Sequence, residues 1–193
     1  MMKYKQNGSF YKLIIAALLL SVPFIFSCGN EISYVNQVKT LDSIQVQLSK
    51  IELQLRQIDT AKLAAVSAQI GDELSFIQTN YKDTMKKDMA MVLTEYQLIR
   101  KSYNLILLKF PEAQKELTIT KEQLKSLGHD LKTNSIDKAN VEGALNTEMG
   151  AANESIQTVI LMNNIIKLRM PRFEELKPNV MDLVNELKEK AQK

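Results

Sequence analysis

Apolar residues recur at alternating intervals of four and three between positions 85 and 110, and this spacing constrains the fold more than any other feature of the sequence. The repeating positions are Met85, Met89, Val92, Tyr96, Ile99, Tyr103, Ile106 and Phe110. Such an alternation puts these side chains on one face of an α-helix that packs in a bundle or coiled coil. After Pro111 the spacing resumes at Leu117, Thr120, Leu124, Leu127 and Leu131. Because a two-residue Phe-Pro reversal would be very tight, the pattern predicts one helix, from about 83 to 132, that is kinked at Pro111.

Two further segments carry the same kind of apolar repeat. The segment from about 32 to 79 has its apolar positions at Leu41, Ile44, Leu48, Ile51, Leu55 and Ile58, and then at Leu63, Val66, Ile70, Leu74 and Ile77. The change of phase after Ile58 is typical of a stutter within a continuous helix. After a predicted turn at 133–135, the last segment has its repeat at Leu145, Met149, Ala152, Ile156, Val159, Asn163, Ile166 and Met170. Its apolar face continues past Pro171 and Pro178 to the C-terminus.

The number and spacing of these segments predict the architecture. The chain has only 6 Gly and 4 Pro, so it contains few residues that favour turns. Helices joined by short connections run antiparallel to their neighbours. We therefore predict an all-α domain over residues 34–193, an elongated up-down-up three-helix bundle with coiled-coil-like packing and kinks at Pro111 and Pro171. A four- or five-helix bundle, broken at these prolines, is the alternative.

An alanine-rich stretch allows a prediction of helix register. Tyr96 and Tyr103 lie about as far after the first predicted turn as four alanines lie before it, namely Ala61, Ala64, Ala65 and Ala68. Small residues opposite large ones fill a core without voids. We therefore expect the two tyrosine rings to pack near these alanines.

The first 27 residues have the pattern of a secretory signal peptide. Residues 1–12 contain three Lys and no acidic residue, and residues 13–26 are apolar except for Ser21. This apolar run is shorter than the roughly 18–20 residues that span a bilayer, and Pro23 interrupts it. A positive start followed by a short apolar stretch favours a cleaved leader over residues 1–27, and an uncleaved membrane anchor is the alternative.

Cys28 follows the apolar stretch directly and is the only cysteine. The stretch Ile25-Phe26-Ser27-Cys28 resembles the lipobox of bacterial lipoproteins, although Phe26 stands where a small residue is usual. The resemblance covers residues 1–28 and implies transfer of a diacylglyceryl group to the Cys28 thiol, cleavage before Cys28, and often acylation of the new amine. Residues 28–33 would then be the lipidated N-terminus and a short tether. Gly29 in place of Asp favours an outer-membrane lipid anchor, on either the periplasmic or the surface face.

No set of residues in the sequence has the pattern of a catalytic or metal site. His129 is the only histidine, so no second histidine is available as a metal or triad partner, and helical phase turns it away from the apolar seam. Adjacent carboxylates such as Glu174 and Glu175 lie on Lys-rich helices and are most simply solvated. Gly143 and Gly150 either pack internally, the interpretation that we favour, or receive a partner helix. We predict no catalytic residue, no cofactor and no metal.

These features predict a non-catalytic lipoprotein of the cell envelope. Three of the 25 basic residues precede Cys28 and none of the 22 acidic residues does, so the mature chain is electrically neutral and nucleic acid is not an expected partner. We expect a scaffold, spacer or interaction subunit that contacts the bilayer through acylated Cys28 and binds a protein partner or another copy of itself. The alternative is a lipoprotein that binds a small apolar molecule between helices, near Met89, Tyr96 and Tyr103. An enzyme ranks last.

Overall fold

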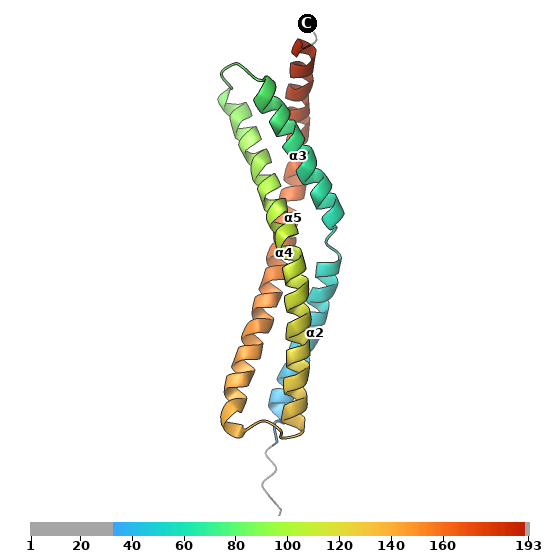
Figure 1. Ribbon diagram of the computed structural model, residues 1–193, viewed down its shortest axis with the longest axis vertical. Coiled ribbons are helices and arrows are strands. Elements are labelled where there is room, and N and C mark those ends of the chain that lie inside the picture. The colour runs from blue at the N-terminus through green and yellow to red at the C-terminus, as the bar shows by residue number, and fades with distance from the viewer. Residues whose placement is uncertain (1–32, 192–193) are drawn as a thin grey trace, which may run out of the picture. The chain divides into compact units, whose positions relative to one another are not determined.

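The computed structural model describes residues 33–191, and over this range the secondary structure is helical with no strand. It contains four α-helices and one short 3-10 helix, namely α2 (Val35–Arg56), α3 (Thr60–Asn80), α4 (Lys87–Lys132), η1 (Lys138–Asn140) and α5 (Val141–Ala191) (Figure 1). The all-α prediction is therefore confirmed. The leader, Cys28 and the predicted tether up to residue 32 lie outside the described residues. None of the helices within the described range is both long and apolar enough to cross a membrane.

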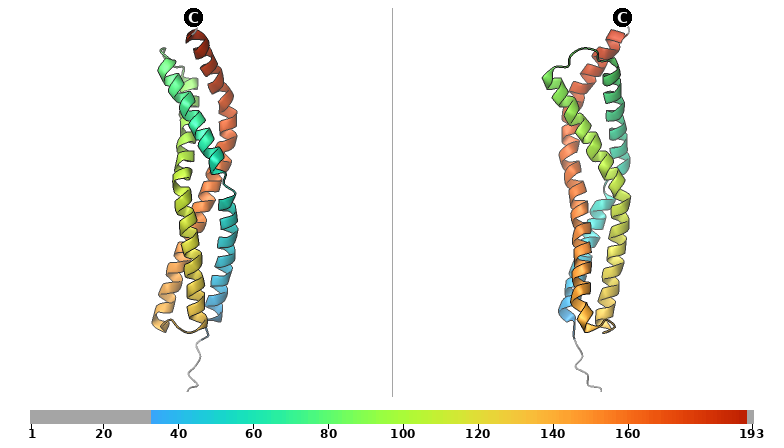
Figure 2. Two further views of the ribbon diagram at one scale, coloured as in Figure 1. Left: turned by 45° about the vertical axis from the view of Figure 1, so that its right-hand side comes forward. Right: turned by 60° about the vertical axis from the view of Figure 1, so that its left-hand side comes forward.

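Helices α4 and α5 are long antiparallel partners, and the two shorter helices pack against both of them. Figures 1 and 2 show that α2 and α3 follow one another along the pair, with α2 beside one half and α3 beside the other. Each half of this unit is therefore built from three helices, which together enclose one apolar core.

The prediction of three helices is not confirmed, because the first predicted segment divides at residues 57–59. In a continuous helix of about 3.6 residues per turn, the five-residue step from Ile58 to Leu63 would rotate the second side chain about 140° away from the seam. Separating α2 from α3 removes this conflict, and both residues are buried. The Asp59 carboxylate caps α3 by accepting a hydrogen bond from the Lys62 N–H at 2.9 Å.

Loss of this cap should weaken the start of α3. We expect Asp59→Ala to lower the free energy of unfolding by about 1 kcal/mol, because the first turn of α3 would lose a hydrogen-bond acceptor. Urea unfolding monitored by circular dichroism measures this loss. Asp42→Ala, at an exposed position within α2, is the control, and an equal effect of the two substitutions would contradict the capping role.

The alternative of a four- or five-helix bundle agrees with the four α-helices of the described residues, but the breaks that it expected at Pro111 and Pro171 are wrong, because the prolines do not divide the long helices. Pro111 lies within α4, and Pro171 and Pro178 lie within α5. All three prolines are exposed. Each one leaves a backbone carbonyl of the preceding turn without its N–H donor. On an exposed face water can hydrogen-bond to that carbonyl, which makes a proline inside the helix tolerable.

The core follows most of the predicted seam. The largest fully buried side chains include Tyr96, Tyr103, Phe173, Leu41, Leu48, Ile70 and Ile99. The predicted packing of the tyrosines on alanines is wrong, because Ala61, Ala64, Ala65 and Ala68 are all exposed. Tyr96 instead donates a hydrogen bond to Glu73 Oε2 at 2.6 Å, and Ser67 donates one to Asn104 Oδ1 at 2.6 Å. The register between α3 and α4 therefore differs from the predicted one by about two helical turns.

Candidate functional site

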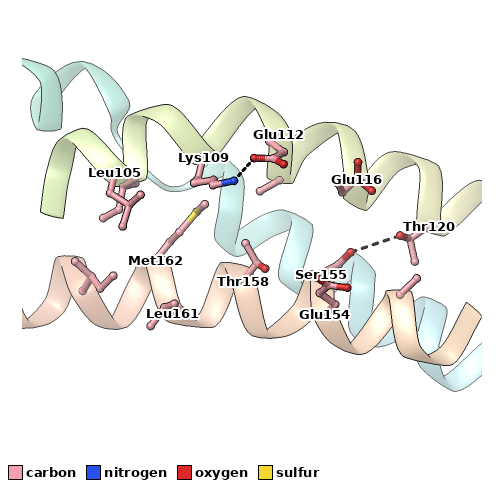
Figure 3. A pocket seen from close by; sticks show the side chains of 14 residues that line it. Leu105, Lys109, Glu112, Glu116, Thr120, Glu154, Ser155, Thr158, Leu161 and Met162 are labelled. Carbon is pink, nitrogen blue, oxygen red and sulfur yellow. Dashed lines mark hydrogen bonds and ion pairs between the residues drawn. The ribbon is translucent and has the colours of Figure 1, made fainter. Parts of the chain in front are cut away.

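A groove of about 470 Å³ runs between α4 and α5 and is the strongest candidate for a functional site. Leu105 and Met162 lie at one end of it, and Thr120 and Glu154 lie at the other (Figure 3). The full lining comprises Leu105, Ile106, Lys109, Glu112, Ala113, Glu116 and Thr120 from α4, and Ala151, Glu154, Ser155, Thr158, Leu161, Met162 and Ile165 from α5. The groove therefore grades from an apolar end to a polar, acidic end.

The apolar end exposes large side chains to solvent. Leu105 is 52% exposed and Leu161 is 60% exposed. Leu98 precedes Leu105 by seven residues, Leu168 follows Leu161 by seven, and both are also exposed. A spacing of seven keeps residues on nearly the same helix face, so the apolar surface extends beyond the groove. A contiguous exposed apolar surface of this kind is typical of an interaction or ligand-binding site.

The acidic end carries more carboxylates than cations. Lys109 Nζ lies 2.6 Å from Glu112 Oε2, so these two charges neutralise each other. Glu116 and Glu154 form no ion pair with any residue between 33 and 191. The acidic end of the groove is therefore negatively charged and favours a positively charged ligand or partner.

Polar contacts between helices hold the walls of the groove. Arg172 on α5 forms ion pairs with Glu95 on α4 at 2.5 Å and with Glu175 at 2.6 Å. Its hydrogen bond lowers the pKa of the Glu95 carboxyl below the usual range. At the acidic end, the hydroxyls of Thr120 and Ser155 lie 3.4 Å apart across the two helices. These contacts join α4 and α5 beyond the apolar end of the groove and at its acidic end.

A second depression, of about 780 Å³, lies between α3 and α4 around Arg100. Within residues 33–191 the buried Arg100 Nε has no hydrogen-bond partner. The guanidinium lies against Gly71, where a Cβ atom would come within 2.8 Å of Arg100 Cζ. Asp72 lines the same depression. Arg100 alone would favour an anion in this depression. The negative charge of Asp72 offsets the positive charge of Arg100, so the depression is a weak candidate for an anion site.

The structure shows where most of the sequence-predicted candidates lie. His129 is exposed, as expected from its helical phase. Tyr96 and Tyr103 are fully buried in the core and do not line the groove, in contrast to what the alternative ligand-binding hypothesis expected. The Asn163 side chain donates a hydrogen bond to the Val159 carbonyl of its own helix at 3.1 Å. Among the residues that the structure describes, no cluster of three or more His, Cys, Asp or Glu is suited to a metal ion.

The predicted internal packing of two glycines is wrong. Gly143 and Gly150 are exposed, and a Cβ atom added at either would have no neighbour within 4 Å. We therefore expect Gly150→Ala to raise the free energy of unfolding by about 1 kcal/mol, because alanine favours the helix and meets no obstacle. Gly71→Ala, which must displace Arg100, should give a smaller gain. Thermal or urea unfolding of both variants checks this order, and destabilisation by Gly150→Ala would show that the position is enclosed.

Most residues of the groove were missed because, apart from Ile106 and Thr120, they lie outside the 4-3 seam. A signal was present, since Leu98 and Leu105, and likewise Leu161 and Leu168, form a second apolar repeat seven residues apart. Such an apolar repeat on an otherwise polar helix face is typical of a surface that binds a partner or ligand.

Comparison with known proteins assigns the chain to no family. No protein-family model, no curated protein and no solved structure matches it.

Proposed function

We propose that this protein is a lipid-anchored, non-catalytic component of a bacterial cell envelope that acts as a scaffold, spacer or interaction subunit. Its anchor would be a diacylglyceryl group on Cys28 after removal of residues 1–27, in the outer membrane. The leader, the position of Cys28 and the likeness to a lipobox support the anchor. The exposed leucines along the α4/α5 groove carry the interaction role, because a partner would remove them from water.

The chemistry of the groove supports a binding role over a catalytic one. The hydroxyls in its lining, on Thr120, Ser155 and Thr158, have no histidine or lysine base within hydrogen-bond distance among the described residues. Activation of a hydroxyl nucleophile requires such a base. Lys109, the one cation in the lining, is paired with Glu112.

Metabolic labelling with radioactive palmitate tests the anchor. The wild-type chain should incorporate label and enter the detergent phase on Triton X-114 partitioning, whereas Cys28→Ala should do neither, because no thiol remains to form the thioether. Ser27→Ala keeps a small residue before the cleavage site and is the matched control, which should still be labelled. Retention of label in Cys28→Ala would refute lipidation at this residue. Protease digestion of intact cells then separates the surface face from the periplasmic face.

Binding of a small apolar molecule in the groove is a second candidate function. The volume of about 470 Å³ falls within the roughly 300–1,000 Å³ of typical ligand sites, and one half of the lining is apolar. A fluorescent fatty acid is a suitable probe, and Ala113→Phe should reduce its binding by filling the buried floor of the groove. Saturable binding of one probe per chain would favour this function, and no binding by the wild type would eliminate it.

A further inference from the structure

We infer that the α4/α5 groove of one molecule receives the outer face of α2 from a second copy of the chain, so that copies assemble side by side into rows. This second copy is one partner of the proposed interaction subunit, and the assembly therefore rests on that function. The outer face of α2 comprises Val46, Lys50, Leu53 and Arg56. Its two cations are opposite in charge to Glu116 and Glu154 at the acidic end of the groove.

The outer face of α2 combines exposed apolar residues with basic ones. Val46 is 57% exposed and Leu53 is 63% exposed. They are seven residues apart and therefore share one side of the helix, pointing away from the buried seam of α2. Lys50 and Arg56 lie three residues to either side of Leu53 and flank it on the same surface. The face thus presents an apolar centre between two cations.

The net charge of this face is positive even though it includes one carboxylate nearby. Glu52 forms ion pairs with both Arg56 and Lys121, and these pairs lower the pKa of its carboxyl. The three positive charges of Lys50, Arg56 and Lys121 exceed the single negative charge of Glu52, so the excess on this side of the unit is positive. In the groove the excess is negative, through Glu116 and Glu154. Opposite excess charges on two surfaces favour their association and oppose contact between like surfaces.

The outer face of α2 and the acidic end of the groove lie at the same height on opposite sides of the helical unit. The ion pair of Glu52 with Lys121 places the basic part of α2 level with that part of α4. The neighbouring Thr120 contacts Ser155 at the acidic end of the groove. Figure 3 shows α2 behind the two helices that flank the groove, and no α2 residue lines it. Copies side by side in one orientation therefore bring Lys50 and Arg56 of one molecule level with the acidic end of the groove in the next.

Such a contact joins two different surfaces, so it does not close into a symmetric dimer. Each molecule that contributes its α2 face still has a free groove, and each that contributes its groove still has a free α2 face. Head-to-tail contacts of this kind extend into open assemblies unless a rotation closes a ring. The expected products are therefore rows whose length grows with concentration.

Reciprocal charge reversal tests the assembly with the full-length chain in detergent, by sedimentation velocity at a large excess of micelles over protein. One variant combines Lys50→Glu with Arg56→Glu, and a second combines Glu116→Lys with Glu154→Lys. In each variant the two surfaces carry the same sign, so we expect its association constant to fall at least about tenfold. A mixture of the two variants restores opposite signs at every contact and should associate as the wild type does. Association of the wild type should also weaken as salt is added.

Two controls separate the contact from general effects of charge or folding. Lys86→Glu with Lys87→Glu makes the same charge change at exposed positions at the start of α4, and it should leave association unchanged. Leu53→Ala should weaken association, whereas Leu108→Ala, at a residue that is 70% exposed and outside the groove lining, should not. Circular dichroism of each variant confirms that the helices are retained.

Several results would overturn the assembly. These are a wild type that stays monomeric throughout the micromolar range, a closed dimer insensitive to both charge reversals, and a failure of the mixed variants to associate. A monomeric wild type that still carries acylated Cys28 would refute the rows and leave the proposed envelope function standing with a different partner. Association of a chain that takes up no palmitate would support the rows and refute the lipid-anchored envelope function.

Discussion

Phe173→Ala is expected to lower the free energy of unfolding by about 3–5 kcal/mol, the largest effect that we predict for a single substitution. The Phe173 side chain is 2% exposed, and its ring stacks on Tyr96 with ring centroids 5.7 Å apart. Lys177 Nζ lies 5.3 Å from the same ring centroid. Alanine would lose these contacts and leave a cavity between α4 and α5. Since a domain of this kind is stable by about 5–15 kcal/mol, the loss would be a large part of the total.

Urea unfolding monitored at a helical circular dichroism band measures this effect. Phe110→Ala is the matched control, because Phe110 belongs to the predicted seam of α4 but is only half-buried. We expect the control to lose less than half as much stability as Phe173→Ala. Equal losses at the two positions would show that helical spacing alone, without the observed burial, determines the contribution of a phenylalanine.

Alkaline pH is expected to destabilise the fold through its two core tyrosines. Burial and the nearby Glu174 carboxylate raise the pKa of Tyr103 to about 12, from an ordinary value of 10.0. Burial and the hydrogen bond to Glu73 raise the pKa of Tyr96 still further. A folded-state pKa above the unfolded one stabilises the fold at pH values below the unfolded pKa. For Tyr103 this stabilisation, roughly 2–3 kcal/mol, is lost as pH rises from about 10 to about 12.

Unfolding free energies measured from about pH 9 to about pH 12 test this prediction, together with absorbance titration of tyrosinate. Tyr103→Phe removes the titrating group and keeps the ring, so it should lose less stability over this interval than the wild type. The hydroxyl of Tyr103 has only a weak contact, 3.8 Å from Met170 Sδ, so the substitution itself should cost little. Tyr81→Phe, outside the core, controls for removal of a hydroxyl. Identical pH profiles for wild type and Tyr103→Phe would refute the role of this residue.

The helical character of the chain and most of its core were predictable from the sequence. Tyr96, Ile99, Tyr103 and Ile106 occupy the predicted seam of α4, and all are buried. The seam was readable because helix periodicity depends only on residues within the same segment. The continuation of α4 and α5 through their prolines was also predicted, and the exposed position of each proline explains why the helices tolerate them.

The candidate groove was less accessible to sequence reasoning. Leu105 and Leu161 are on different helices, and their approach depends on how α4 and α5 pair. The alternative ligand-binding hypothesis required a cavity near Met89, Tyr96 and Tyr103, but the observed packing closes the core around the two tyrosine rings. Exposed apolar side chains can be recognised only when every neighbouring helix is in place, because any side chain off the seam could still be covered by another element.

The sequence by itself determined that this chain forms helices and which face of each helix is apolar. Tertiary structure alone decided that α2 and α3 are separate, that Ala61 and Ala65 face solvent, and that a groove opens between α4 and α5. The division has a physical reason. Periodicity is a property of a few neighbouring residues, whereas register and exposure depend on contacts between segments that are far apart in the chain.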